Sequence, residues 1–331
     1  MPFVIPYFIP HQGCPHQCLF CNQNSITGKN RGCGDVKKEI EDTITLWSSY
    51  QRKKEPVQFA FYGGSFTCLP VEQQIAMLET VRQNTKVDLI RLSTRPDCID
   101  KHICDILREY GVGIVELGVQ SLDDEVLSAS LRGHNAQACV GAVTHLREAG
   151  MQIGIQLMPG LPRESRTSFL RTVSKVIDLR PDFVRIYPAL VLEDSGLAVL
   201  YQRGRYQPLT LDMAVILTAR ARGLFLDAGI GVVRMGLQPS PSLKESIVTG
   251  PYHPAFGELV LAREWLMRVR RLLLKFPEQK MQVTISTRDL SSFNGPRKSN
   301  RLRLQELGLD ERLEVKVDKN MERGKMHYVV C

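Results

Sequence analysis

Short apolar segments alternate with segments of helical periodicity over the first 200 residues of the chain. Six segments rich in β-branched and aromatic residues predict strands over 3–10, 57–62, 88–94, 114–120, 152–158 and 183–189. Between them, apolar residues recur at i, i+3 and i+4 and predict helices over 35–53, 71–84, 99–109, 135–149 and 165–179. Asp35 and Asp100 stand where two of these helices would be capped. The alternation predicts a parallel α/β sheet, and it leaves open whether that sheet is open or curls into a partial barrel.

Each predicted strand has one apolar face and one polar face. In 114–120, Val115, Leu117 and Val119 alternate with Glu116, Gly118 and Gln120. The polar positions of the other strands include Arg91, Ser93, Arg95, Gln156, Met158, Arg185 and Tyr187. Helices should cover the apolar faces, so the polar faces should point to the enclosed side. Two interpretations stay open: a polar network that satisfies itself, or a cofactor and substrate cavity at the carboxyl ends of the strands.

The pattern changes after Pro239, where the stretch Gln-Pro-Ser-Pro-Ser (238–242) suggests a boundary between units 1–238 and 239–331. The second unit is predicted to hold a long helix over 255–276, a strand over 281–286, a loop over 291–300 and a short helix over 301–307. Strands near 313–318 and 326–330 complete a small α+β extension.

Composition excludes several protein classes, and charge adds one hypothesis. Of 331 residues, 43% are hydrophobic and 24% are charged, which excludes a disordered, collagenous or membrane-spanning chain. The net charge is +8, and residues 251–331 hold 16 Lys and Arg against 10 Asp and Glu. Arg297, Lys298, Arg301 and Arg303 lie together in this basic region, which would suit RNA phosphates. The alternative is a small cap over the barrel mouth with a solvated basic face.

Six of the nine cysteines follow no pattern: Cys33, Cys68, Cys98, Cys104, Cys139 and Cys331. Scattered cysteines are most often small buried hydrophobic residues. The first residues lack the basic and apolar regions of a signal peptide, so we expect a cytoplasmic protein with reduced thiols.

The remaining cysteines, Cys14, Cys18 and Cys21, form a Cys-x3-Cys-x2-Cys cluster directly after the first predicted strand. A closed zinc site would need a fourth ligand such as His16 or Cys33. A redox pair would leave Cys14 without a role. Three thiolates on a cubane [4Fe–4S] cluster leave one iron open to a small bidentate ligand. The spacing favours the iron–sulfur cluster.

Phe20 directly before the third cysteine completes a motif that resembles the signature of radical S-adenosylmethionine (SAM) enzymes. The segments FYGGSFT (61–67), STRPD (93–97), VELGVQSLDDEVL (115–127), RGH (132–134), GIQLMPGLP (154–162), RIYPALVLEDSGLAVLY (185–201) and RMGLQPS (234–240) resemble the radical half of the Elongator catalytic subunit. The likeness spans roughly residues 5–290. The chain stops where that subunit continues into an acetyltransferase domain, and it has Arg163 after MPGLP where related chains often have Gly.

The resemblance implies an incomplete (β/α)6 barrel and a set of cofactor ligands. Cys14, Cys18 and Cys21 would hold the cluster, and the fourth iron would take the methionyl group of SAM. Gly63 and Gly64 would face the methionyl ammonium of SAM. Ser93 and Arg95 would bind its ribose and carboxylate, and Gln120 would bind the ribose hydroxyls. Phe20 and Met158 would line the rest of the cofactor site. Arg95 can form a bidentate pair with a carboxylate, although an ion pair with Asp97 is the alternative. Arg185 and Tyr187 are expected on the substrate side as catalytic candidates.

These implications predict an enzyme that cleaves SAM to a 5′-deoxyadenosyl radical, with RNA or tRNA as the expected partner class. The resemblance also implies an electron donor such as flavodoxin or ferredoxin. It does not imply a membrane partner. Two alternatives remain: a radical oxidase or decarboxylase similar to oxygen-independent coproporphyrinogen oxidase, and a zinc-stapled RNA-binding module.

Overall fold

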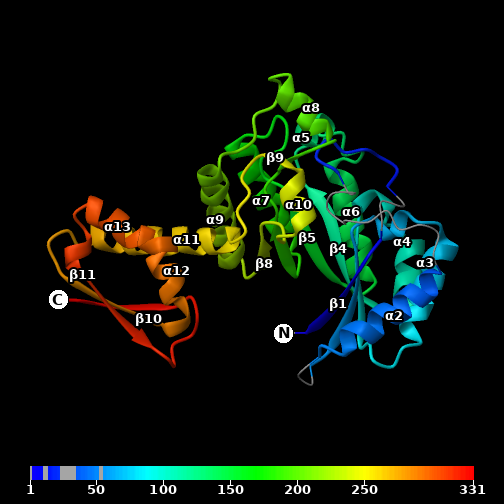
Figure 1. Ribbon diagram of the computed structural model, residues 1–331, viewed down its shortest axis with the longest axis horizontal. Helices are drawn as coiled ribbons and strands as arrows, with labels where there is room; N and C mark the ends of the chain where they lie inside the picture. The colour runs from blue at the N-terminus through cyan, green and yellow to red at the C-terminus, as the bar shows by residue number, and fades with distance from the viewer. Residues whose placement is uncertain (1, 10–13, 23–34, 52–54) are drawn as a thin grey trace.

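Seven parallel strands form the main sheet of the protein, which curls into a half-barrel (Figure 1). The structure is a computed structural model and describes residues 2–9, 14–22, 35–51 and 55–331. The strand order is β1-β2-β3-β4-β5-β6-β8. The strands are β1 (Phe3–Phe8), β2 (Val57–Tyr62), β3 (Leu89–Thr94), β4 (Val112–Gln120), β5 (Gln152–Leu157), β6 (Phe183–Ile186) and β8 (Gly231–Met235). The predicted partial barrel is confirmed, with one more strand than the six expected.

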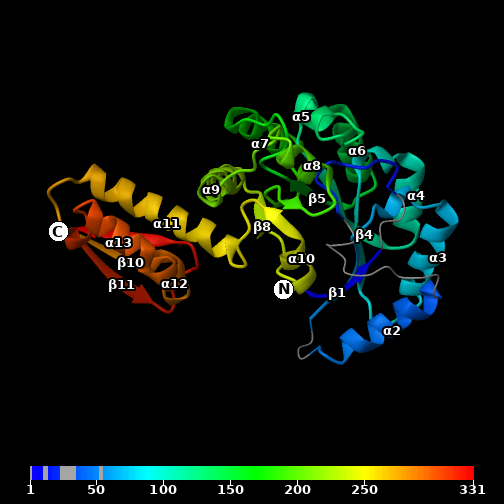
Figure 2. The ribbon, with the colours of Figure 1, turned by 45° about the horizontal axis from the view of Figure 1, so that its top comes forward.

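Helices follow the strands and cover the outer face of the sheet (Figure 2). They are α2 (Val36–Ser48), α3 (Val71–Arg82), α4 (Lys101–Glu109), α6 (Ala136–Glu148), α7 (Arg166–Leu179) and α9 (Leu211–Asp227). The Asp35 side chain accepts hydrogen bonds from the amides of Lys37 and Lys38, and Asp100 accepts one from Ile103. Both predicted helix caps are therefore confirmed. α9 was not predicted.

Apolar and polar side chains lie on opposite faces of the strands, as the sequence predicts. Val115, Leu117 and Val119 are fully buried in the core that the sheet shares with its helices. Glu116 lies on the opposite, inner face of the same strand and is only 5% exposed. The half-barrel therefore has an apolar outside beneath the helices and a polar inside.

Short elements collect at the carboxyl ends of the strands. They are α5 (Asp124–Ala129), β7 (Val191–Leu192), α8 (Gly196–Gln202), α10 (Pro241–Ser246) and β9 (Ile247–Thr249). β7 pairs with β9 in an antiparallel ladder. These pieces are too short to leave a periodic signal in the sequence, and none was predicted.

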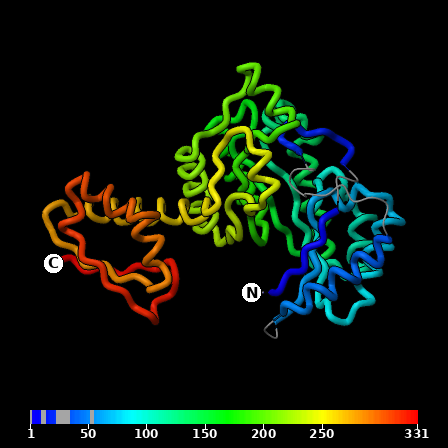
Figure 3. The backbone as a smooth tube through the Cα atoms, in the orientation of Figure 1, coloured from blue at the N-terminus to red at the C-terminus, as the bar shows by residue number. Residues whose placement is uncertain are grey.

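A small α/β unit follows the half-barrel and has its own hydrophobic cluster (Figure 3). It comprises α11 (Phe256–Lys275), β10 (Met281–Ser286), α12 (Leu290–Asn294), α13 (Ser299–Glu306), β11 (Leu313–Asp318) and β12 (Met326–Val330). β10 is central, parallel to β11 and antiparallel to β12. The loop expected over 291–300 is shorter than predicted, because α12 reaches Asn294 and α13 begins at Ser299. Only residues 295–298 separate the two helices, and Gly295, Arg297 and Lys298 there have positive φ.

Helix α11 joins this unit to the half-barrel. Phe256 and Val260 in its first turns pack against Ala214 and Val215 of α9. The unit lies beside the half-barrel next to α9, away from α5 and α8 (Figures 1 and 2). The division into units 1–238 and 239–331 stays a prediction. None of the described helices is long and apolar enough to cross a membrane.

Candidate functional site

Two backbone hydrogen bonds hold the cysteine segment at the carboxyl end of the half-barrel. The amide of Leu19 donates to the carbonyl of Ser130 (3.1 Å), and its carbonyl accepts from the amide of Leu197 (2.7 Å). Gly196 permits this approach, because a Cβ there would come within 2.4 Å of the Leu19 side chain. The segment is thus clamped between the end of α5 and the start of α8.

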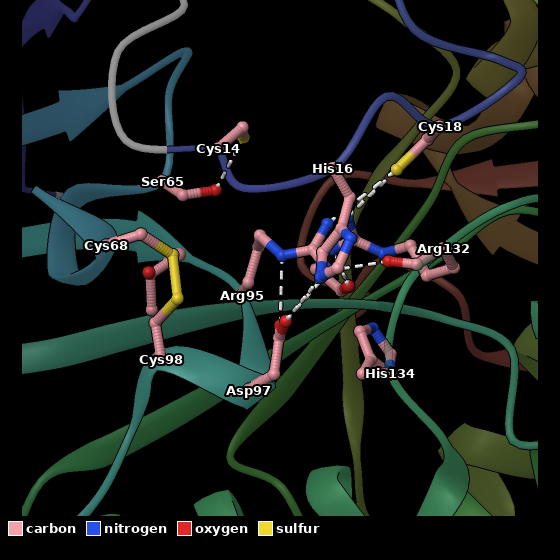
Figure 4. A network of polar contacts seen from close by, with 12 residues as sticks. Cys14, His16, Cys18, Ser65, Cys68, Arg95, Asp97, Cys98, Arg132 and His134 are labelled. Carbon is pink, nitrogen blue, oxygen red and sulfur yellow. Dashed lines mark hydrogen bonds and ion pairs between the residues drawn. A yellow bond between two sulfur atoms is a disulfide. The ribbon is translucent and has the colours of Figure 1, made fainter.

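None of the three clustered cysteines forms a disulfide, and Figure 4 shows the surroundings of Cys14 and Cys18. Cys14 Sγ lies 3.0 Å from the hydroxyl of Ser65. Cys18 Sγ is buried and lies 3.4 Å from Arg132 Nη1 and 3.7 Å from Arg95 Nη1. Two guanidinium groups thus lie beside the thiol of Cys18, and they would offset the negative charge of a thiolate that binds iron.

The donor chemistry fits an iron–sulfur cluster, although the thiols are not gathered around one point. Within the described ranges, no three His, Cys, Asp or Glu residues form a group that could hold a metal ion. His16, the proposed fourth ligand of a zinc site, lies 3.7 Å from Asp97 instead. Cys33, the other candidate for a zinc ligand, falls outside the described residues.

Arg95 is buried at the end of β3, with 1% of its surface exposed. Its Nε and Nη2 atoms donate to the two carboxylate oxygens of Asp97, each at 2.9 Å, and Nη2 also donates to the carbonyl of Arg132 at 2.5 Å. Burial raises the pKa of Asp97, but the hydrogen bonds and charge of Arg95 outweigh it and lower that pKa overall. The alternative ion pair with Asp97 is present, and the role of Arg95 toward a cofactor carboxylate stays a prediction.

The RGH segment brings Arg132 to Cys18 and places His134 near Arg132, and the sequence analysis assigned a role to neither. Arg132 donates to the carbonyl of Gly118 (2.5 Å), and its Nε atom is buried without a partner in the described structure. Burial and the nearby Arg132 charge lower the pKa of His134 to about 4, so its ring is neutral near pH 7. Gly133 (φ 84°) admits His16, whose ring would lie 2.3 Å from a Cβ at that position. The RGH motif could be seen in the sequence, but no neighbouring residue indicated that Arg132 contacts Cys18.

A hydrogen bond and a disulfide connect the ends of β2 and β3 near Cys14. The hydroxyls of Thr67 and Thr94 lie 2.6 Å apart, and Cys68 forms a disulfide with Cys98 (Figure 4). Gly63 has a φ of 93°, so it makes the tight turn that other residues would adopt only with strain. Gly64 and Ser93 are half-buried nearby along the same two strand ends.

The disulfide corrects two predictions: that Cys68 and Cys98 are separate small hydrophobic residues, and that the thiols of the chain are reduced. Cys68 and Cys98 are not independent small hydrophobic residues, because adjacent parallel strands bring their following loops together. Cys104 and Cys139 are buried and free as expected, whereas Cys331 is exposed.

Gln120, Met158 and Phe20 lie around the ends of β4 and β5. Gln120 adopts a φ of 69°, and its carbonyl accepts from the Met158 amide (3.0 Å). Gln156 donates to the Gln120 side chain (3.3 Å). Phe20 and Met158 pack in one small cluster with Val126, Leu161 and Ala189. A left-handed backbone at a buried glutamine is strained, and such positions concentrate at functional sites.

Arg185 and Tyr187 belong to a polar network that crosses the inside of the half-barrel. Glu116 Oε1 accepts from Arg91 Nη2 (2.5 Å), Arg185 Nη2 (3.0 Å) and the Tyr62 hydroxyl (3.3 Å). Arg185 Nη1 also donates to the Tyr187 hydroxyl (3.2 Å). The self-satisfied polar network is therefore present on the inner face. Whether Arg185 and Tyr187 also act on a substrate stays a prediction.

Comparison with known proteins extends these observations. The Radical SAM superfamily model matches residues 8–176, half of the chain, and the Radical_SAM C-terminal domain matches residues 181–268. An uncharacterized protein of Methanocaldococcus jannaschii, MJ0486, is 30% identical over 60% of this chain and 64% of its own length. The tRNA uridine(34) acetyltransferase of the same organism is 34% identical over 67% of this chain and 48% of its own length.

The solved structures agree on the fold. The archaeal Elp3 of Methanocaldococcus infernus with an N-terminal deletion superposes with a TM-score of 0.63 at 21% identity, covering 83% of this chain and 63% of that one. Our chain thus spans about half to two thirds of the length of these similar proteins. The likeness to the radical half of the Elongator subunit is confirmed. Because the Radical SAM model matches half of the chain, the chain belongs to the radical SAM superfamily, a family of enzymes that bind a [4Fe–4S] cluster and SAM.

Proposed function

We propose that this enzyme cleaves SAM on a [4Fe–4S] cluster and directs the resulting radical at an RNA substrate, with tRNA as the substrate class. The observation that carries the proposal is the free thiol of Cys18, flanked by Arg95 and Arg132 at the carboxyl end of the half-barrel. Positive charge at that point suits both an anionic cluster and the carboxylate of SAM.

Each predicted site residue has a role in this proposal. Cys14, Cys18 and Cys21 ligate the cluster, and Gly63 and Gly64 leave room for the methionyl group. Ser93, Arg95 and Gln120 hold the polar parts of SAM, and Phe20 and Met158 exclude water from its adenosyl part. The bound cofactors supply one-electron cleavage of a C–S bond, which yields a 5′-deoxyadenosyl radical. Arg185 and Tyr187 orient the substrate from the inner face of β6 and the residue after it.

The substrate class rests on the relatives and on charge. A relative carries the name tRNA uridine(34) acetyltransferase, and the net charge here is +8. Arg297 and Lys298 are exposed in the C-terminal unit, whereas Arg301 pairs with Asp310 (3.1 Å) and Arg303 with Glu306 (2.7 Å). Arg297 and Lys298 therefore have more freedom to meet phosphates.

The proposal also includes a reductant and a location. A flavodoxin or ferredoxin supplies the electron, because SAM cleavage consumes one from the cluster. We assign the enzyme to the cytoplasm, where tRNA and reducing conditions for a labile cluster are found.

The experiment is anaerobic turnover with total tRNA from a strain lacking the gene, followed by nucleoside mass spectrometry. We expect 5′-deoxyadenosine formation to rise on tRNA addition and a new modified nucleoside to form. A SAM-cleaving enzyme that ignores tRNA but binds a porphyrin with a visible absorption band would favour the oxidase alternative. Stoichiometric zinc without iron after anaerobic reconstitution would favour the zinc-stapled module.

A further inference from the structure

A cavity lies beside the loop that follows β5, next to the predicted cofactor site. Its volume is about 850 Å³, which is in the range of small-molecule pockets. Residues of α5, of the loop 161–164 and of the segment 200–207 line it. Leu161 lines the cavity and also packs in one cluster with Phe20 and Met158, so the cavity adjoins the expected adenosyl site. Figure 1 shows α5 and α8 side by side at this end of the molecule.

Two arginine side chains at this cavity have no polar partner among the described residues. Arg163 and Arg205 line it, and both are exposed. Among the residues that the structure describes, neither guanidinium has a hydrogen-bond or ion-pair partner, in contrast to Arg91, Arg95 and Arg185. Uncommitted guanidiniums are the groups that recognise phosphate with two parallel hydrogen bonds.

The backbone at Arg163 adds an independent observation. Its φ is 61°, in the left-handed region where a residue with a Cβ is strained and glycine is not. A strained non-glycine residue at the lip of a cavity indicates that its side chain is needed there.

Hydrogen bonds hold the floor of the cavity, which also carries a buried polar atom without a partner among the described residues. Glu164 Oε2 accepts from the Gly160 amide (2.7 Å), and the Tyr206 hydroxyl donates to the Gly160 carbonyl (2.6 Å). Glu164 Oε1 is buried and has no hydrogen-bond partner within the described structure. Burial raises the pKa of Glu164 to about 8, so near pH 7 this carboxyl is protonated and does not repel an anion.

The opposite wall is acidic. Asp124 and Glu125 line it from the first turn of α5, and Asp124 also accepts from the Ala136 amide (2.7 Å). Carboxylates accept hydrogen bonds from the amino groups of nucleobases. A ligand that matches both walls carries a phosphate at one end and amino or ring N–H donors at the other.

We propose that this cavity binds one nucleotide unit of the RNA substrate, with its phosphate between Arg163 and Arg205 and its base toward Asp124 and Glu125. The inference rests on the proposed RNA substrate and adds where a nucleotide next to the reacting one is held. It also accounts for the arginine that follows the MPGLP segment.

The test compares the double variant Arg163→Gly/Arg205→Ser with Arg180→Gly. Arg180 is a matched control, since it is an exposed arginine with a left-handed backbone (φ 48°) outside the cavity. Filter binding of bulk tRNA across a salt series is the main readout. We expect the log–log salt slope of the double variant to be shallower by about 0.7 to 0.9, the value for one phosphate, with affinity at low salt reduced roughly tenfold or more. Arg180→Gly should bind as the wild type does.

A second measurement separates binding from folding. Arg163→Gly alone should unfold at a temperature equal to or above that of the wild type, because glycine relieves the strain. A pyrimidine nucleoside monophosphate, which lacks the adenine that the cofactor site accepts, should raise the unfolding temperature of the wild type but not of the double variant. The nucleoside without phosphate should not raise it.

The outcomes are distinguishable. If the wild type binds tRNA and the double variant binds it equally well, the cavity inference is wrong and the proposed function stands. Equal loss in Arg180→Gly would show a general charge effect and would also overturn the inference. If the wild type has no affinity for tRNA at low salt, the proposed function fails, and the inference fails with it.

Discussion

The carboxyl group of Glu164 should make the stability of this protein fall as pH rises, and Glu164→Gln should remove that effect. Burial is the largest cause that raises the pKa of Glu164 to about 8, and the charge of Asp123 adds to it. Hydrogen bonds from the amides of Gly160 and Leu161 oppose the rise without cancelling it. The pKa of the same group in the unfolded chain is near its ordinary value of 4.5.

The sign and size follow from proton linkage. Between about pH 4.5 and pH 8 the folded chain keeps a proton that the unfolded chain has released, so rising pH favours unfolding. Each pH unit within that window costs about 1.4 kcal/mol, so the full effect is on the order of 4 kcal/mol by pH 8. Glutamine has no proton to release, and its side-chain oxygen can still accept from the Gly160 amide.

The assay is urea unfolding of the wild type and Glu164→Gln at pH 5, 6.5 and 8, with free energies from linear extrapolation. We expect the variant to gain stability over the wild type as pH increases, with the largest difference at pH 8. Glu278→Gln, a change at an exposed carboxylate, is the control and should show a flat difference. A difference for Glu164→Gln that stays constant from pH 5 to pH 8 would refute the reasoning, because it would mean that Glu164 is ionised in the folded state.

Three further predictions concern the cofactors and the RNA. Reconstituted protein should contain about four iron and four sulfide per chain; Cys18→Ala should abolish this and Cys104→Ala should not, and a full cluster in Cys18→Ala would contradict the ligand assignment. Arg95→Ala should weaken SAM binding by about 1.5–3 kcal/mol in equilibrium titrations, the strength of a hydrogen bond to a charged group; unchanged affinity would move the carboxylate contact to another residue such as Arg132. Replacing Arg297, Lys298, Arg301 and Arg303 by Ser should flatten the salt slope of tRNA binding by up to about 3 while cluster content stays intact, with most of the loss at Arg297 and Lys298. An unchanged slope would exclude these four residues from the RNA surface.

Some elements could be predicted because their signals are local. The six predicted strands and five predicted helices of the half-barrel match β1 to β6 and α2, α3, α4, α6 and α7 within a few residues at each end. Helix α9 and strand β8 were missed. α9 is apolar over much of its surface because it packs against both the sheet and α11, so it lacks a clear amphipathic period.

The site was predictable to a different extent. The Cys-x3-Cys-x2-Cys spacing predicts the cluster ligands, and that assignment stays a prediction. The quoted segments lie at the strand ends around Cys14 and Cys18. The partners of those residues were not predictable. Nothing near Arg132 in the sequence indicates that it lies 3.4 Å from Cys18 Sγ, because 114 residues separate the two in the chain.

By itself, the sequence determined the order of the first six strands and of five helices between them, the polar and apolar faces of those strands, and the family to which the chain belongs. These properties depend on backbone periods of 2 and 3.6 residues and on short motifs, so neighbouring residues encode them. Only the tertiary structure decided that Cys68 pairs with Cys98, that Glu116 joins Arg91 to Arg185, and that Arg163 and Arg205 share a cavity. Such pairings depend on which strand ends become neighbours when the sheet curls. They join side chains that are far apart in the sequence, so no local pattern encodes them.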